Sequence, residues 1–321
     1  MVRLRSLFQR LDQFLVLLIL TVIAASLLPA RGAVVPIVDH VTVIAIALLF
    51  VLYGARLSPQ AIWSGLANWR LQALVFAGTF ALFPLVGLLV TGAARSWLPG
   101  EVATGLLFLC LLPSTVQSSI AFTSIARGNV PAALCSASLS NLLGVLLTPL
   151  LVAQLLPGAG NGLSLQALKD IALQILLPFI VGQMLRPWIG DWLLRHPRLT
   201  AVVDRGSVLI VVYAAFSAGV VAGLWHRMSV GGLIGVCLLD LLILAIVIGI
   251  MMFTSRRLAF SREDEIAIVF CGSKKSMASG IPMAAILFSG RTVGLIVLPL
   301  MIFHQAQLVV CAMMARRYAA Q

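Results

Sequence analysis

The chain has 321 residues, of which 61% are hydrophobic and 10% are charged, and its mean hydropathy is +1.10. A soluble domain carries about 25% charged residues, so this composition cannot cover a water-facing surface and excludes a soluble globular protein. The formal net charge is +12. Because the basic residues lie in short loops between apolar runs, they indicate orientation in a membrane and not binding to nucleic acid.

The apolar residues form ten runs, many of them about 20 residues long, which is the length that crosses a hydrocarbon core about 30 Å thick. Runs such as residues 241–252 do not alternate polar and apolar residues, as the strands of a membrane barrel do. We therefore predict an all-α membrane protein. Its ten transmembrane helices are expected at residues 14–30, 37–56, 71–91, 102–126, 130–156, 167–187, 206–225, 231–253, 264–288 and 292–315.

The orientation of the chain in the membrane is predicted from the basic residues in its loops. The first run resembles a signal peptide, but residues 29–33 form a poor cleavage site, so we expect this helix to be retained. With the amino terminus in the cytoplasm, fifteen of the twenty Lys and Arg residues in loops lie on the cytoplasmic side. The positive-inside rule therefore predicts a multi-pass protein of the cell membrane, in bacteria the inner membrane, with both termini cytoplasmic.

Ten helices divide into two halves of five, residues 1–156 and 157–321. Because each half has an odd number of spans, the second half would have inverted topology. The fourth and ninth spans are each interrupted by a polar cluster, at residues 113–119 and 272–276. Interrupted helices at matching places in two inverted halves predict the binding site of a transporter.

The cluster in the fourth span begins at Pro113, which removes a backbone donor and disturbs the preceding helical turn. The polar side chains after it are candidates for binding a substrate. The alternative is a kinked helix whose hydroxyl groups bond to their own backbone. The candidates are Ser114, Thr115, Gln117, Ser118 and Ser119.

The cluster in the ninth span holds Lys274 and Lys275, flanked by Ser273 and Ser276. A lysine at the centre of a span costs about 2.5–3.5 kcal/mol, so intramembrane lysines are functional candidates by default. The alternative is that both lysines lie in a loop. Asp240 in the eighth span is expected to form a charge pair with Lys274 or Lys275, either as a structural ion pair or beside an ion site.

Two further polar groups are weaker candidates. His304 in the tenth span would relay protons or make an interhelical hydrogen bond. Asn141 and the nearby serines of the fifth span would serve an ion site or only allow close helix packing. The five cysteines form no CxxC motif, and no nucleophile or phosphate-binding motif is present in the sequence, so we expect neither an enzyme nor a cofactor.

Residues 113–149, with an Ala-Arg-Gly-Asn-Val turn and a Leu-Leu-Thr-Pro ending, resemble the bile acid:sodium symporter superfamily. Residues 270–284 resemble its prokaryotic SBF-like branch. The resemblance covers essentially the whole chain. It implies inverted five-helix repeats, with helices 4 and 9 broken and crossing at mid-membrane, and a panel of helices 1, 2, 6 and 7 beside a core of the other six. It also implies organic anions as substrates, taken up with sodium.

The sequence departs from the sodium-coupled pattern of that superfamily. Phe270 stands where coupled members have a glutamate, and Lys274-Lys275 stand where they have Gln-Asn. The sodium-binding hydroxyls of helix 5 correspond to Ala133 and Ala137. Because Phe and Ala offer no side-chain oxygen, we predict that one lysine ammonium occupies the space where relatives hold sodium.

These patterns predict a secondary transporter of an organic, anionic solute, with its site at the crossing of helices 4 and 9 and without a need for sodium. Its expected partners are a small organic anion, membrane lipid, and sodium or a proton as coupling ion. Two alternatives remain open at this point: a proton-coupled exchanger and a membrane regulator that transports nothing.

Overall fold

The computed structural model describes residues 13–56, 68–94, 96–156, 172–223, 229–288 and 292–320, and every regular element in these ranges is helical. The π-helical turn η1 lies between α5 and α6, and the π-helical turn η2 precedes α11. The elements are α2 (Gln13–Leu27), α3 (Val34–Arg56), α5 (Trp69–Ala77), η1 (Gly78–Leu82), α6 (Phe83–Ala94), α7 (Gly100–Leu111), α8 (Gln117–Ile125), α9 (Val130–Leu155), η2 (Ala172–Leu176), α11 (Leu177–Arg195), α12 (Pro197–Val221), α13 (Val230–Arg257), α14 (Arg262–Gly272), α15 (Met277–Leu287) and α16 (Val293–Ala320).

Six helices among the described residues are long and apolar enough to cross a membrane, which confirms an all-α, multi-pass membrane protein. They are α3, the continuous run α5–η1–α6, α9, α12, α13 and α16. The other four predicted spans correspond to the 15-residue α2, to η2–α11, and to the broken pairs α7–α8 and α14–α15. Several basic residues of the orientation argument, among them Arg95, Lys169, Arg227 and Arg291, lie outside the described residues, as do Arg3, Arg5 and Arg10.

Both predicted interruptions are present. Helix α7 ends at Leu111, and Leu112 is extended (φ −77°, ψ 156°) because a residue before proline is pushed out of the helical region. Helix α14 ends at Gly272, and α15 begins after Ser276, whose hydroxyl accepts from the N–H of Ser279. Lys274 and Lys275 lie in the non-helical segment between α14 and α15, as the loop alternative expected, but both are fully buried.

The two breaks contact each other through backbone groups that the helices leave free. The N–H of Ser276 donates to the carbonyl oxygen of Pro113 at 2.8 Å. The Ser114 hydroxyl donates to the carbonyl of Cys271 at 2.6 Å, and the Ser119 hydroxyl to that of Phe270 at 3.0 Å. Because buried backbone groups need partners, these bonds fix the position of one broken helix on the other.

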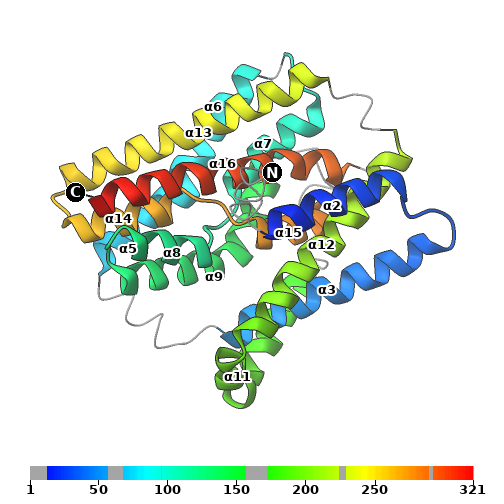
Figure 1. Ribbon diagram of the computed structural model, residues 1–321, viewed down its shortest axis with the longest axis horizontal. Helices are drawn as coiled ribbons and strands as arrows, with labels where there is room; N and C mark the ends of the chain where they lie inside the picture. The colour runs from blue at the N-terminus through cyan, green and yellow to red at the C-terminus, as the bar shows by residue number, and fades with distance from the viewer. Residues whose placement is uncertain are drawn as a thin grey trace, which may run out of the picture.

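The helices form two groups (Figure 1). Helices α2, α3, α11 and α12, which we call the four-helix group, pack against one another, while α5–α9 and α13–α16 form the larger group. Within the four-helix group, a Cβ atom on Gly54 would meet the carbonyl of Phe179, and one on Gly182 would meet the carbonyl of Val51. These glycines therefore let α3 and α11 approach closely, as small residues do between membrane helices.

Candidate functional site

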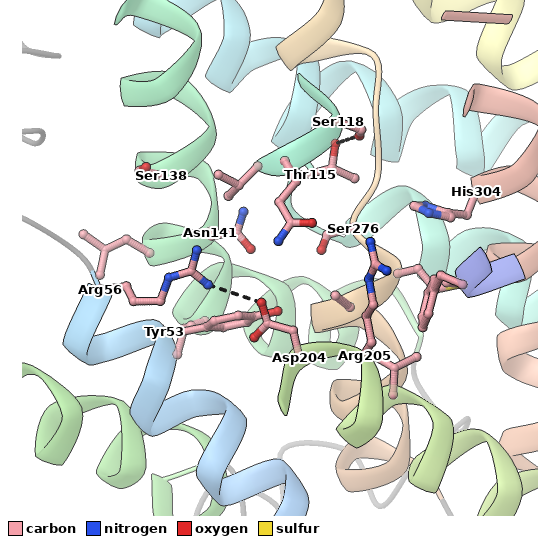
Figure 2. A pocket seen from close by; sticks show the side chains of 18 of the residues that line it. Tyr53, Arg56, Thr115, Ser118, Ser138, Asn141, Asp204, Arg205, Ser276 and His304 are labelled. Carbon is pink, nitrogen blue, oxygen red and sulfur yellow. Dashed lines mark hydrogen bonds and ion pairs between the residues drawn. The ribbon is translucent and has the colours of Figure 1, made fainter. Parts of the chain in front are cut away.

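A cavity of about 340 Å³ lies between the four-helix group and the crossing of the broken helices (Figure 2). This volume lies within the range of small-molecule sites. Most of its wall is apolar, and its polar side chains come from both groups. Those of the four-helix group are Tyr53, Arg56, Asp204 and Arg205, and those of the larger group are Thr115, Gln117, Ser118, Ser138, Asn141, Ser276 and His304.

The first turn of α8 forms one side of this cavity, through Val116, Gln117 and Ser118. Val116 precedes the helix and provides no side-chain cap. The first N–H groups of a helix have no partner within it, and its N-terminus carries about half a positive charge. The start of α8 therefore offers free donors and positive potential to a ligand, the arrangement that favours an anion.

The first turn of α15 lies on the same cavity, through Ser276, Met277 and Ala278. This N-terminus is occupied differently, because Ser276 caps it and also donates its own N–H to Pro113. Asn141 of α9 lies between the two breaks, where its amide nitrogen donates to the carbonyl of Ser114 at 2.7 Å. The polar end of the cavity is thus built from the two broken helices and α9.

Charged side chains of the four-helix group face this polar end (Figure 2). Arg56 of α3 pairs with Asp204 of α12, with 3.2 Å between Nη1 and Oδ2. The second carboxylate oxygen of Asp204 is buried and, among the described residues, has no hydrogen-bond partner. Arg205 lies beside them, with its guanidinium 5.6 Å from the ring centre of Phe14. Two cations against one anion leave an excess of one positive charge on this wall.

The two lysines do not line the cavity. The Nζ atom of Lys275 donates to three backbone carbonyls, those of Thr79 at 2.8 Å, Cys110 at 2.9 Å and Leu112 at 2.6 Å. The Nζ atom of Lys274 lies 3.2 Å from the Ser118 hydroxyl oxygen. It also lies over the rings of two phenylalanines, 4.7 Å from the centre of Phe122 and 5.8 Å from that of Phe270.

The structure therefore divides the residues predicted from sequence. One set lines the cavity: Thr115, Gln117, Ser118, Asn141, Ser276 and His304. A second set is buried within the crossing or beside it, away from the cavity: Ser114, Ser119, Ser273, Lys274 and Lys275. Of these, Ser273 donates to the carbonyl of Val269 in its own helix, a local bond that serine hydroxyls commonly make.

The expected charge pair of Asp240 is not formed. Both of its carboxylate oxygens are buried and have no hydrogen-bond partner in the described part of the chain. Lys275 is instead satisfied by carbonyl oxygens that the end of α7 and the π-turn supply, and Lys274 by a hydroxyl and two aromatic faces. Backbone carbonyls thus take the place of the Asp240 carboxylate as partners of Lys275.

Sequence reasoning missed the charged wall of the four-helix group. Arg56 and Arg205 entered only the count of cytoplasmic basic residues, and Asp204 lies just before the predicted span at 206–225. The available signal was the presence of opposite charges, Arg56 and Asp204, at the ends of two predicted spans.

Comparisons with known proteins identify the family of the chain. The chain matches the family described as the SBF-like CPA transporter family over residues 12–320. It is 55% identical over 309 residues to an uncharacterised protein of Pseudomonas aeruginosa, covering 96% of this chain and 93% of that one. It is 52% identical over 320 residues to YfeH, a candidate symporter of Escherichia coli K12, covering 98% and 95%.

A more distant relative is sodium/bile acid cotransporter 7 of Rattus norvegicus, which is 28% identical over 314 residues, covering 93% of this chain and 90% of the relative. The apolar spans and these relatives together indicate a membrane protein of the secondary transporter class. Because the family match extends over nearly the whole chain, this protein belongs to the SBF-like CPA transporter family.

Proposed function

We propose that this protein transports an organic anion and that the cavity between the two helix groups is its substrate site. The observation that carries this proposal is the uncapped first turn of α8, which opens on the cavity opposite the guanidinium groups of Arg56 and Arg205. A carboxylate or similar anionic group is the natural ligand of free N–H donors and of arginine. The substrate's anionic group would lie between these two walls.

The rest of the cavity indicates the body of that anion. Its remaining wall is largely apolar, with Phe179 and Val208 on one side and Leu134 and Leu142 on the other. Such a surface binds a hydrocarbon or ring system by removing apolar area from water. The expected substrate is therefore an amphipathic organic anion with one charged end.

For the architecture, we propose ten spans in two inverted five-helix repeats, residues 1–156 and 157–321. The broken pairs α7–α8 and α14–α15 would each count as one span, and the four-helix group would be the panel. Because the cavity lies between the groups, movement of one group past the other would expose it to alternate sides. Both chain termini would lie in the cytoplasm. A reporter enzyme that is active only in the periplasm should therefore be inactive when it is fused after Gln321.

We also propose that transport does not need sodium. The distant relative is named a sodium/bile acid cotransporter. By the resemblance to that superfamily, however, Phe270, Ala133 and Ala137 of this chain fall where coupled members have their sodium ligands. Two lysine ammonium groups are buried in the same region, and Lys274 contacts the ring of Phe270. A tethered cation can hold the broken helices together as sodium does, but it cannot leave and so supplies no driving force.

The test begins with a thermal-shift screen of the purified protein against organic anions, because a ligand that binds only the folded state raises the melting temperature. The uptake of each stabilising anion is then measured in liposomes that contain the protein, with either sodium or choline in the external buffer. Equal uptake in both salts is the expected result. No accumulation of any stabilising anion would contradict the transport proposal, and a large loss in choline would contradict sodium independence alone.

Proton-coupled exchange is a second candidate, favoured by Asp240. A buried carboxyl group without a hydrogen-bond partner, within a span, is a group able to gain and lose a proton during transport. Uptake that follows an imposed pH gradient and is lost in Asp240→Asn would support this coupling. Uptake that is the same with and without the pH gradient would exclude proton coupling.

A further inference from the structure

Lys275 occupies a site built almost wholly from backbone. Its ammonium has no carboxylate partner among the described residues; instead it donates to three carbonyl oxygens at 2.6–2.9 Å, and the ring centre of Phe83 lies 4.1 Å away. We call the carbonyls of Thr79, Cys110 and Leu112 the carbonyl cage. These distances are ordinary for charged N–H···O hydrogen bonds, so all three ammonium protons have an acceptor.

The carbonyl cage owes its oxygens to irregular backbone and not to Lys275. Cys110 and Leu112 lie at the end of α7, where the break before Pro113 leaves carbonyls without helical donors and the helix dipole is negative. Thr79 lies in the π-turn η1, where the helical hydrogen-bond pattern shifts. Converging backbone carbonyls are also what ion channels use to bind monovalent cations. A change of side chain at position 275 therefore leaves the oxygens in place.

The backbone of Lys275 is fixed independently of its side chain. The Gln307 side chain accepts from the Lys275 N–H at 2.9 Å and donates to the Lys275 carbonyl at 2.9 Å. Gln307 is fully buried on α16 and is also in contact with Nδ1 of His304 at 2.8 Å. Truncating Lys275 thus leaves both the cage and the segment that closes it.

We propose that the carbonyl cage is a monovalent-cation site that the protein fills with its own Lys275 ammonium, and that removing this side chain lets a free ammonium-type cation bind there. The inference deepens the proposed sodium independence, since it assigns the role of tethered cation to Lys275 and not to Lys274. The environment of Lys274 is a poorer cation site, because it offers one hydroxyl and two aromatic faces and no carbonyl within the described structure.

The experiment compares Lys275→Ala with Lys274→Ala in detergent. Alanine keeps Cβ, so propylammonium has the shape and charge of the missing atoms. Lys275→Ala should lower the melting temperature by about 5 °C or more, and propylammonium should restore at least half of that loss. Tetramethylammonium, which has no N–H donor, and 1-propanol, which has no charge, should restore much less. The matched variant Lys274→Ala should not respond to propylammonium more than the unchanged protein does.

Equal restoration by propylammonium, tetramethylammonium and propanol, or equal restoration of both variants, would overturn the proposal. If Lys275→Ala yields no folded protein, it is purified with propylammonium present throughout and then exchanged into tetramethylammonium or 1-propanol. Aggregation on exchange supports the proposal, and failure to fold in propylammonium contradicts it. The unchanged protein gives a further check: its melting temperature should not differ between sodium, potassium and choline chloride, and a clear requirement for sodium would contradict a filled site. None of these measurements needs transport, so a failure of the proposed function is seen separately, in the liposomes.

Discussion

The crossing of the broken helices has two sides with opposite chemistry. On the cavity side, the first turn of α8 has no side-chain cap and faces the arginines of the four-helix group across open space. On the buried side, the end of α7 meets Lys275, which is fully enclosed and makes three carbonyl contacts. A single break thus opens one helix end to the cavity and places the other against the buried ammonium of Lys275.

Because the two sides differ in this way, changes on the cavity side and changes on the buried side should affect different properties, ligand affinity and protein stability respectively. On the cavity side the first turn of α8 has no side-chain cap, so under the proposed function changes to the side chains around it should alter affinity. Groups on the buried side have permanent partners, and a buried polar group left without one is destabilising.

The largest effect is expected for Lys275→Met. Methionine fills much of the volume but leaves the carbonyls of Thr79, Cys110 and Leu112 without their donor, so we expect a loss of about 3 kcal/mol and reduced transport. The measurement is denaturation of the purified protein, with Arg31→Met in an exposed turn as control. A Lys275→Met protein as stable as the control would mean that the buried ammonium is dispensable.

The next effect is expected for Arg205→Gln, on the cavity side. If the cavity is the substrate site, loss of this charged donor from its wall should raise the KM for the anion about 10- to 100-fold, while the melting temperature stays nearly unchanged. Arg198→Gln is the matched control, because Arg198 is exposed, lies on the same helix α12 and does not line the cavity. If both variants transport alike, the anion is not recognised by this wall.

A smaller effect is expected for Lys274→Met. The Lys274 ammonium contacts one hydroxyl group and two aromatic rings. Among the residues that the structure describes, the Ser118 hydroxyl is therefore the one polar group that loses a hydrogen-bond donor in the methionine variant. We expect a loss of about 1 kcal/mol, measured in the same denaturation series as Lys275→Met. A loss as large as that of Lys275→Met would remove the distinction between the two lysines.

These neighbouring lysines also show where sequence reasoning ends. The breaks were predictable because their causes are local: Pro113 forces the preceding residue out of the helix, and a polar cluster follows. The environment of Lys275 could not be predicted in this way, because Thr79 and Cys110 lie 196 and 165 positions away from it in the sequence. Likewise Arg56 and Asp204 are 148 positions apart in the sequence. Each residue by itself indicates only the end of a membrane span. Only packing brings such residues together.

The smallest effect is expected for Gln117→Ala. Gln117 is the first residue of α8, its side chain is exposed to the cavity, and its removal leaves the backbone N–H groups of that turn in place. Loss of one neutral hydrogen bond corresponds to about 0.5–1.5 kcal/mol, so the KM should rise about 2- to 10-fold with membrane insertion and melting temperature unchanged. Ser273→Ala is a useful comparison, because this hydroxyl is also in a broken helix but bonds only to its own backbone and does not reach the cavity. It should leave the KM unchanged. If Gln117→Ala and Ser273→Ala have the same KM as the unchanged protein, the start of α8 does not contact the substrate through side chains, and its backbone donors alone remain to hold the anion.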